Sequence, residues 1–420
     1  MKKIEKERLW IFSPVTNVVL NAEFTGCKDE TRFTVAICAA VNSFQAFKSK
    51  VFLDDEGKSF FIPIENANYS IKENNSSIET LICEQEQKQF DIWNGEYLRF
   101  FYTKSSNGFT LLLIAHHIIG DGLSFSFLLE SILKAMSGEK LELVPDKEID
   151  IKTLSAKSKL SFPIRFMMGG MNKKWGKSEK KFTIQDYTKM TEKYWEEHSS
   201  FVKYEKLNQE EYHRLINFSK ETKLTVNTLI TTALLSADSK CNDCGQAVSI
   251  REENNRFMGN YASGISIKYK YNDNIDFISN AKKVQKLMNK KTDNVNSKFF
   301  LMNFMNGIKP NLIDAIYFSA CGFYENTVAH NFASMFGYTG NAKGLSVTNL
   351  KLLPIVSQIE NYNIKNVIFI PPLVLNAKRI IGIVSLGEKL YITMHIDGKK
   401  DINSHSMIFL KAIKKLKELK

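Results

Sequence analysis

The chain has 420 residues, of which 44% are hydrophobic and 24% are charged, and its formal net charge is +12. This globular composition provides for a large core, and the length suits two lobes of about 200 residues. No apolar run approaches the roughly 18 residues of a membrane-spanning helix, and the first residues lack the apolar stretch of a signal peptide. We therefore expect a cytoplasmic protein with free cysteines.

The composition also bears on partners and metals. The positive charge would suit phosphates, but the sequence has no motif of a nucleic-acid-binding domain, so we expect no nucleic-acid partner. Cys241 and Cys244 have the spacing of metal ligands, yet a structural zinc site needs four ligands and no second pair accompanies them. We expect no metal site.

The first hundred residues predict alternating strands and helices. Residues 9–24 should form a strand and a loop, and residues 31–47 a helix with one apolar face. Residues 58–64 predict a strand and residues 77–89 a polar helix, followed by a turn that enters another strand over residues 90–100. This alternation indicates an α/β protein.

The next strand carries the strongest signal in the chain. The apolar run Leu111–Ala115 predicts a strand buried on both faces, with His116 and His117 at its exit. A turn containing Asp121 and Gly122 follows, and apolar residues at helical spacing continue from it. Strand exits of this kind present side chains to a cleft.

The chemistry of these residues favours a functional site. Adjacent strand residues point to opposite faces, so only one of His116 and His117 can face a given cavity. A neutral imidazole with a pKa of about 6.5 can accept a proton at cytoplasmic pH. Asp121 could fix the turn by a salt bridge or by accepting backbone N–H groups, and Gly122 would permit close approach of a ligand or a positive φ. A lone His on an apolar strand is usually a core residue, but this combination is too specific for that interpretation.

The segment His116-His117-Ile-Ile-Gly-Asp121-Gly122 resembles the active-site motif of the CoA-dependent acyltransferase superfamily. That group includes chloramphenicol acetyltransferase-like folds, condensation domains of nonribosomal peptide synthetases, alcohol acyltransferases, and wax ester and diacylglycerol acyltransferases. The resemblance implies that His117 is the general base. It also implies that Asp121 is mainly structural and pairs with an arginine from the second half of the chain, and that His116 and Gly122 shape the site. The implied fold is two chloramphenicol acetyltransferase-like lobes, each a mixed β-sheet with flanking helices, with a tunnel between them.

Residues 138–200 interrupt the globular pattern with loops rich in lysine and glutamate. We expect an N-terminal lobe over residues 1–160, an interlobe linker over 161–200 and a C-terminal lobe over 201–420. The Met-rich, Lys-rich stretch 160–181 could pack on its own lobe with solvated lysines, rest on a membrane surface, or hold an acyl chain.

The second half begins with two predicted helices. Asn208 and Glu211 have capping-box spacing, and Thr225 caps a buried helix that resembles one in the second lobe of the family. Arg251 ends a strand that is similar to the arginine-bearing strand of the family, and it is the candidate partner of Asp121, with Arg256 as the alternative. We expect a bidentate, planar arginine–carboxylate pair.

The last third predicts further strands. Asn349 lies in a stretch similar to the "Ser-Asn-x-Gly" segment near the family's active site, although the trailing Gly is absent. We expect Asn349, or Thr348, either to act in the reaction, by donating to the oxyanion or positioning the acceptor, or simply to cap a loop. Strands beginning near residues 367, 380 and 389 are expected to share one sheet, and a basic amphipathic helix closes the chain.

These features predict an acyltransferase that binds no resident cofactor. The donor would be an acyl thioester of CoA or of a phosphopantetheinyl carrier protein, and the acceptor a small alcohol or amine. The basic surface could attract the phosphates of CoA or an acidic carrier protein, or simply be solvated. One alternative is a non-catalytic module that binds a carrier-tethered chain. Another is an enzyme that epimerises or cyclises such a chain with the same histidine.

Overall fold

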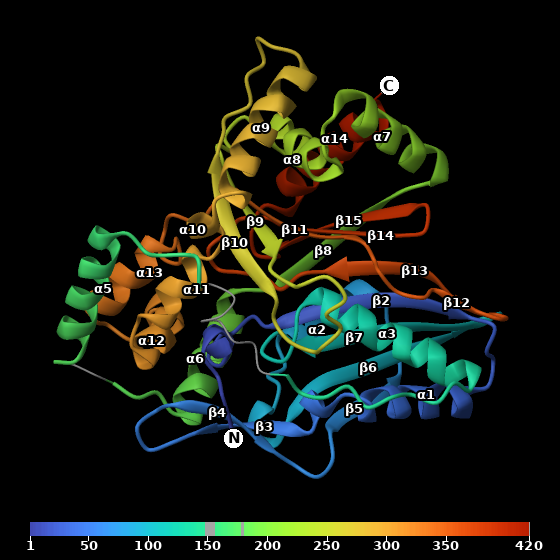
Figure 1. The fold of residues 1–420 in the computed structure, drawn as a ribbon, viewed down its shortest axis with the longest axis horizontal. Helices are drawn as coiled ribbons and strands as arrows, with labels where there is room; N and C mark the ends of the chain where they lie inside the picture. The colour runs from blue at the N-terminus through green and yellow to red at the C-terminus, as the bar shows by residue number, and fades with distance from the viewer. Residues whose placement is uncertain (148–155, 178–179, 420) are drawn as a thin grey trace.

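The computed structural model describes residues 1–147, 156–177 and 180–419, which form two six-stranded sheets flanked by helices (Figure 1). The first sheet contains most of the N-terminal strands. In spatial order its strands are β12 (Gln358–Ile359), β13 (Tyr362–Ile370), β2 (Asn17–Thr25), β7 (Gly108–His116), β6 (Glu96–Ser105) and β5 (Asn68–Glu73). The expected α/β fold class is confirmed.

Strand β7 lies in the middle of the first sheet. It pairs antiparallel with β2 on one side and β6 on the other, and every residue from Leu111 to His116 is buried. The sequence prediction of a strand covered on both faces is therefore confirmed. A strand held on both edges gives the residues at its exit a rigid base.

The second sheet mixes parallel and antiparallel pairs. In spatial order its strands are β10 (Ala262–Lys268), β9 (Asp243–Ser249), β11 (Leu345–Leu352), β14 (Ile380–Leu386), β15 (Lys389–Asp397) and β8 (Ser200–Leu207). Strand β11 runs parallel to both of its neighbours, whereas the remaining pairs are antiparallel.

One expectation about this sheet is wrong. The strands beginning near residues 367, 380 and 389 do not share one sheet, because β13 pairs with β2 of the first sheet while β14 and β15 lie in the second. The segment 358–370 thus extends from the C-terminal half into the N-terminal sheet. Periodicity shows that a segment is a buried strand but does not show which edge it joins.

Helices cover the two sheets and fill the space beside them. The first sheet is flanked by α1 (Glu30–Asn42), α2 (Ile78–Glu86) and α3 (Gly122–Ser137). The second is flanked by α7 (Gln209–Thr222), α8 (Val226–Ala237), α9 (Phe277–Thr292) and α14 (Ile402–Lys417). The expected caps are confirmed: Asn208 and Glu211 form a reciprocal capping box, and the hydroxyl of Thr225 accepts the N–H of Thr228.

A third group of helices stands beside the sheets (Figure 1). It contains α5 (Phe162–Trp175), α6 (Ile184–Glu197), α10 (Val295–Lys298), α11 (Phe300–Asn306), α12 (Pro310–Ala320) and α13 (Thr327–Met335). The stretch 161–200, expected as a linker, therefore includes two helices, and both bury apolar side chains, among them Met168 and Trp175. Within the described residues, no helix is long and apolar enough to cross a membrane.

The N-terminal segment lies where these groups meet. Strand β1 (Lys2–Lys3) joins a small sheet with β4 (Ser59–Pro63) and β3 (Ser49–Leu53), and the one-turn helix η1 (Lys6–Trp10) follows it. Arg8 of η1 is buried and forms an ion pair with Asp314 of α12, with its Nε 2.9 Å from Oδ1. This pair fixes η1 against the helical group.

Candidate active site

The two histidines at the end of β7 have different environments. The side chain of His116 is only 1% exposed, and its Nδ1 accepts the N–H of Ile118 at 3.1 Å. Its ring lies edge-on to Phe90, with the centroids 5.6 Å apart. Burial, with a smaller contribution from nearby positive charge, lowers the pKa of His116 to about 3. His116 is thus a neutral residue that holds the turn.

His117 is partly exposed, unlike its neighbour. Its Nδ1 lies 2.9 Å from the carbonyl oxygen of Gly120, and because a carbonyl can only accept, Nδ1 must carry the proton. The lone pair of the neutral ring is then on Nε2. Burial lowers the pKa of His117 below its ordinary value, although the carboxylate of Asp121 and the bond to Gly120 partly offset this effect. The ring is therefore neutral at pH 7 and has an acceptor nitrogen.

Trp10 of η1 fixes the plane of the His117 ring. The two rings stack with centroids 4.1 Å apart and an interplanar angle of 24°. The sequence analysis did not identify Trp10, because its contact with His117 joins residues more than a hundred positions apart. The flat face of the indole limits the imidazole to motion within its own plane.

The glycines of the motif turn are required by close packing. A Cβ on Gly122 would lie 2.8 Å from the ring of Phe369 and 3.1 Å from the side chain of Leu350. One on Gly120 would lie 2.9 Å from the sulfur of Met258. Neither glycine has a positive φ. Gly122 therefore gives room to side chains of β13 and β11.

Asp121 caps helix α3 and also contacts the second lobe. Its Oδ1 accepts the N–H of Ser124 at 2.8 Å and the hydroxyl of Ser124 at 2.9 Å, and its Oδ2 accepts the N–H of Tyr261 at 2.8 Å. Burial by itself would raise the pKa of Asp121, but the Arg251 guanidinium and these hydrogen bonds hold it below its ordinary value. Asp121 is therefore charged, and its oxygens hold the start of α3 and the loop at Tyr261.

Arg251 lies against Asp121. One nitrogen, Nη2, is 3.0 Å from Oδ1 of Asp121 and 2.6 Å from the hydroxyl of Ser124. The pair is not the bidentate fork that we expected, because the other carboxylate oxygen is occupied by Tyr261 and Nη1 donates to the carbonyl oxygen of Phe257 at 2.8 Å. We call Asp121, Ser124, Arg251 and Tyr261 the interlobe clasp.

Two other residues of the same C-terminal loop contact the first lobe. Arg256, the alternative partner of Asp121, instead forms an ion pair with Glu130 of α3 and lies 4.3 Å over the ring of Phe127. Asn260 donates from its side-chain amide to the backbone carbonyl of His117. The loop thus holds the backbone of the histidine itself. This contact joins residues 143 positions apart, so it depends on the tertiary fold.

Asn349 does not reach this loop. Its side-chain nitrogen donates to Asn227 at 3.2 Å, and its oxygen accepts the N–H of Lys351 at 2.7 Å. Strand alternation turns the next side chain, Leu350, toward Gly122 instead. Of the two expected roles for Asn349, the geometry favours the loop cap and gives no support to the oxyanion donor.

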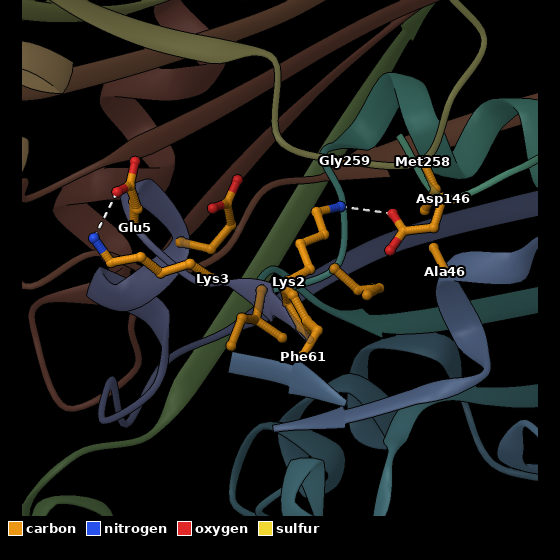
Figure 2. A pocket seen from close by; sticks show the side chains of 11 residues that line it. Lys2, Lys3, Glu5, Ala46, Phe61, Asp146, Met258 and Gly259 are labelled. Atoms are coloured by element: carbon orange, nitrogen blue, oxygen red, sulfur yellow. Dashed lines mark hydrogen bonds and ion pairs between the residues drawn. The ribbon is translucent and has the colours of Figure 1, made fainter. Parts of the chain in front are cut away.

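A small pocket separates the N-terminal segment from the motif turn (Figure 2). Its volume is about 30 Å³, enough for a water molecule but not for a substrate. Its walls come from several parts of the chain, and they include Lys3, Glu7, Ile118, Ile119, Met258 and Gly259. In this conformation the N-terminal segment closes one side of the site.

The remaining candidate residues do not form a metal centre. Cys241 and Cys244 are buried free thiols, and burial raises the pKa of both. Within residues 1–147, 156–177 and 180–419, no group of three His, Cys, Asp or Glu side chains could hold a metal ion.

Comparisons with known proteins concern the family and the fold. Residues 12–153 match the family model of the condensation domain, whereas no curated protein matches the chain in sequence. The first condensation domain of the CDA synthetase is similar at 11% identity and a TM-score of 0.66, over 100% of this chain and 95% of that one. The trichothecene 15-O-acetyltransferase of Fusarium sporotrichioides is similar at 11% identity and a TM-score of 0.65, over 99% and 94%.

A third similar structure is polyketide synthase associated protein 5 from Mycobacterium tuberculosis, at 13% identity and a TM-score of 0.63 over 99% of this chain and 97% of that one. These likenesses span the full length, and they confirm the expected pair of chloramphenicol acetyltransferase-like lobes. The resemblance is therefore confirmed at the level of the fold: residues 12–153 match the condensation-domain model, and the whole chain is similar in fold to condensation domains and to an acetyltransferase.

Proposed function

We propose that the protein transfers an acyl group from a thioester of CoA or of a carrier protein to an alcohol or amine acceptor, with His117 as general base. The observation that supports this proposal best is the fixed tautomer of His117. The carbonyl of Gly120 holds the proton on Nδ1, which leaves Nε2 as a proton acceptor on a partly exposed ring.

The proposed reaction needs only this one base. Nε2 takes the proton of the acceptor hydroxyl or amine as the acceptor oxygen or nitrogen attacks the thioester carbonyl. The tetrahedral intermediate then expels the thiolate, and the imidazolium returns the proton to sulfur. Atoms and charge balance without a covalent acyl-enzyme or a bound cofactor.

The surroundings of His117 support this role. Burial lowers its pKa, so the base is unprotonated at neutral pH before the acceptor arrives. Its ring plane is fixed by Trp10 and its backbone carbonyl by Asn260. A base that is positioned in advance loses little entropy when the substrate binds.

The test is release of free thiol from acyl-CoA or from an acylated carrier protein in the presence of alcohols and amines. Positioned general bases contribute about 10²–10⁴ in rate, so His117→Ala should lose two or more decades of kcat while remaining folded. His213→Ala is the matched control, since His213 is half exposed on α7 and pairs with Glu388. Full transferase activity in His117→Ala would exclude the proposed base.

A second candidate function is that of an accessory module, which is supported by the similarity to a polyketide synthase associated protein. Such a module would bind a carrier-tethered chain without releasing thiol, and its binding would not depend on His117. Structures with this fold also include the epimerization domain of tyrocidine synthetase B and the cyclization-docking bidomain of EpoB. Mass spectrometry of the products separates ester or amide formation from epimerisation and cyclisation.

A further inference from the structure

Lys6 has an unusual environment for a lysine. It is the first residue of η1, the one-turn helix whose last residue, Trp10, stacks on His117. Its stem is partly exposed, but its ammonium nitrogen is shielded from solvent and has no hydrogen-bond partner within the described residues. An ammonium carries three donors, and burying it without an acceptor is unfavourable.

The neighbouring cation of the same helix shows the contrast. Arg8 is also buried, but both Nε and Nη2 donate to the carboxylate of Asp314. Within the described residues, no carboxylate accepts a hydrogen bond from the Lys6 ammonium. Glu7 and, more weakly, Asp121 act on it through their charge alone, and the oxygens of Asp121 already accept from Ser124, Arg251 and Tyr261.

The ammonium shares its surroundings with the catalytic histidine. The charges that act on Lys6 are those of Glu7, Asp121 and Arg251, and the charge of Lys6 in turn lowers the pKa of His117. The same short helix carries Trp10, which stacks on the His117 ring. A group bound to Lys6 would therefore lie near the reacting atoms.

We propose that Lys6 binds a carboxylate of the substrate, which supplies the missing acceptor for its buried ammonium. This inference rests on the proposed acyl transfer and specifies its substrate class. The phosphates of CoA or of a carrier arm are unsuitable, because the whole pantetheine chain separates them from a thioester carbonyl placed at His117. The carboxylate belongs either to the acyl group, as in a dicarboxylic monothioester, or to the acceptor, as in an amino or hydroxy acid.

Two matched pairs of substrates distinguish these sources. Succinyl-CoA is compared with butyryl-CoA, and each of several amino acids with its carboxamide, by the ratio of their kcat/KM values for thiol release. A hydrogen bond to a charged group typically changes an affinity or a kcat/KM value about ten- to hundred-fold. Lys6→Met should therefore lower the ratio of kcat/KM values by that factor in one of the two pairs. Lys104→Met is the control, because Lys104 is half exposed on β6 and already pairs with Glu30 at 2.8 Å.

A labelling experiment gives a readout that does not depend on transfer. Burial lowers the pKa of Lys6, so its amine is neutral more often than that of an ordinary lysine. Trace acetic anhydride, which must enter by the same route as a small carboxylate, should therefore acetylate Lys6 at neutral pH, and mass spectrometry quantifies the adduct. Succinate or an amino acid should protect Lys6, whereas succinamide or the carboxamide should not.

The outcomes separate the inference from the proposed function. Suppose the wild type releases thiol. If it shows no preference for the carboxylate substrates, or if Lys6→Met keeps that preference, the role of Lys6 is overturned and acyl transfer stands. If no substrate pair releases thiol, the labelling experiment still tests the carboxylate site. Protection of Lys6 by carboxylates alone supports the site, and absence of protection refutes it.

Discussion

Replacing Asp121 by alanine should show how much of the protein's stability depends on the interlobe clasp. The substitution removes the acceptor of four donors: the N–H and hydroxyl of Ser124, Nη2 of Arg251 and the N–H of Tyr261. Removing one partner of a buried ion pair costs about 3–5 kcal/mol, and loss of a helix N-cap costs about 1 kcal/mol. The free energy of unfolding should therefore fall by about 4–6 kcal/mol, a large part of the 5–15 kcal/mol typical of a domain.

The measurement is urea unfolding followed by tryptophan fluorescence, together with kcat at temperatures where the variant is folded. Asp121→Asn keeps the shape and one acceptor oxygen, so its loss of stability should lie between those of the wild type and the alanine variant. Adding Arg251→Met to Asp121→Ala should cost less than the sum of the two single changes, because the first change already leaves the guanidinium unpaired.

Asp238→Ala is the matched control. Asp238 forms a shielded ion pair with Arg379, and both residues belong to the second lobe. The Asp238→Ala variant should be less stable than the wild type, but its folded form should keep the wild-type kcat. An Asp121→Ala protein as stable as the wild type yet inactive would refute the structural role and make Asp121 a chemical participant.

Three further predictions concern pH and the surface. Because the pKa of His117 is lowered, log kcat/KM should rise with pH and level off below pH 6.5, and an apparent pKa above that value would contradict the desolvated base. Burial raises the pKa of Glu86 to about 8, and both of its oxygens lack a partner within the described residues. Folding therefore takes up a proton between pH 4.5 and 8, so the free energy of unfolding should fall by up to about 1.4 kcal/mol per pH unit there, and Glu86→Gln should abolish this slope in urea titrations. The exposed rings of Phe162 and Phe166 stack on a helix that ends in lysines. If this helix rests on a membrane, as the stretch 160–181 allows, changing both to serine should weaken cosedimentation with anionic vesicles about tenfold, and equal binding of both proteins would exclude that contact.

The sequence by itself determined the local structure and the chemical type of the site. An uninterrupted apolar run forms a strand that must be covered on both faces, and helical spacing after a turn forms a helix, because both depend on the period of neighbouring residues. The caps at Asn208 and Thr225 could be predicted for the same reason, since a cap is a contact within three residues. The motif from His116 to Gly122 is equally local, so it could be found without the structure.

Tertiary structure decided which of these residues work together. Neighbouring histidines are equivalent in sequence, and only packing buries His116 while leaving His117 partly exposed. The choice of Arg251 over Arg256, the membership of β13 in the first sheet and the stacking of Trp10 on His117 all join residues more than a hundred positions apart. Such contacts form only when distant parts of the chain come together in the folded protein, and no local period encodes them. The orientation of Asn349 away from the motif has the same cause, because the register of a strand decides which of two adjacent side chains faces the other lobe.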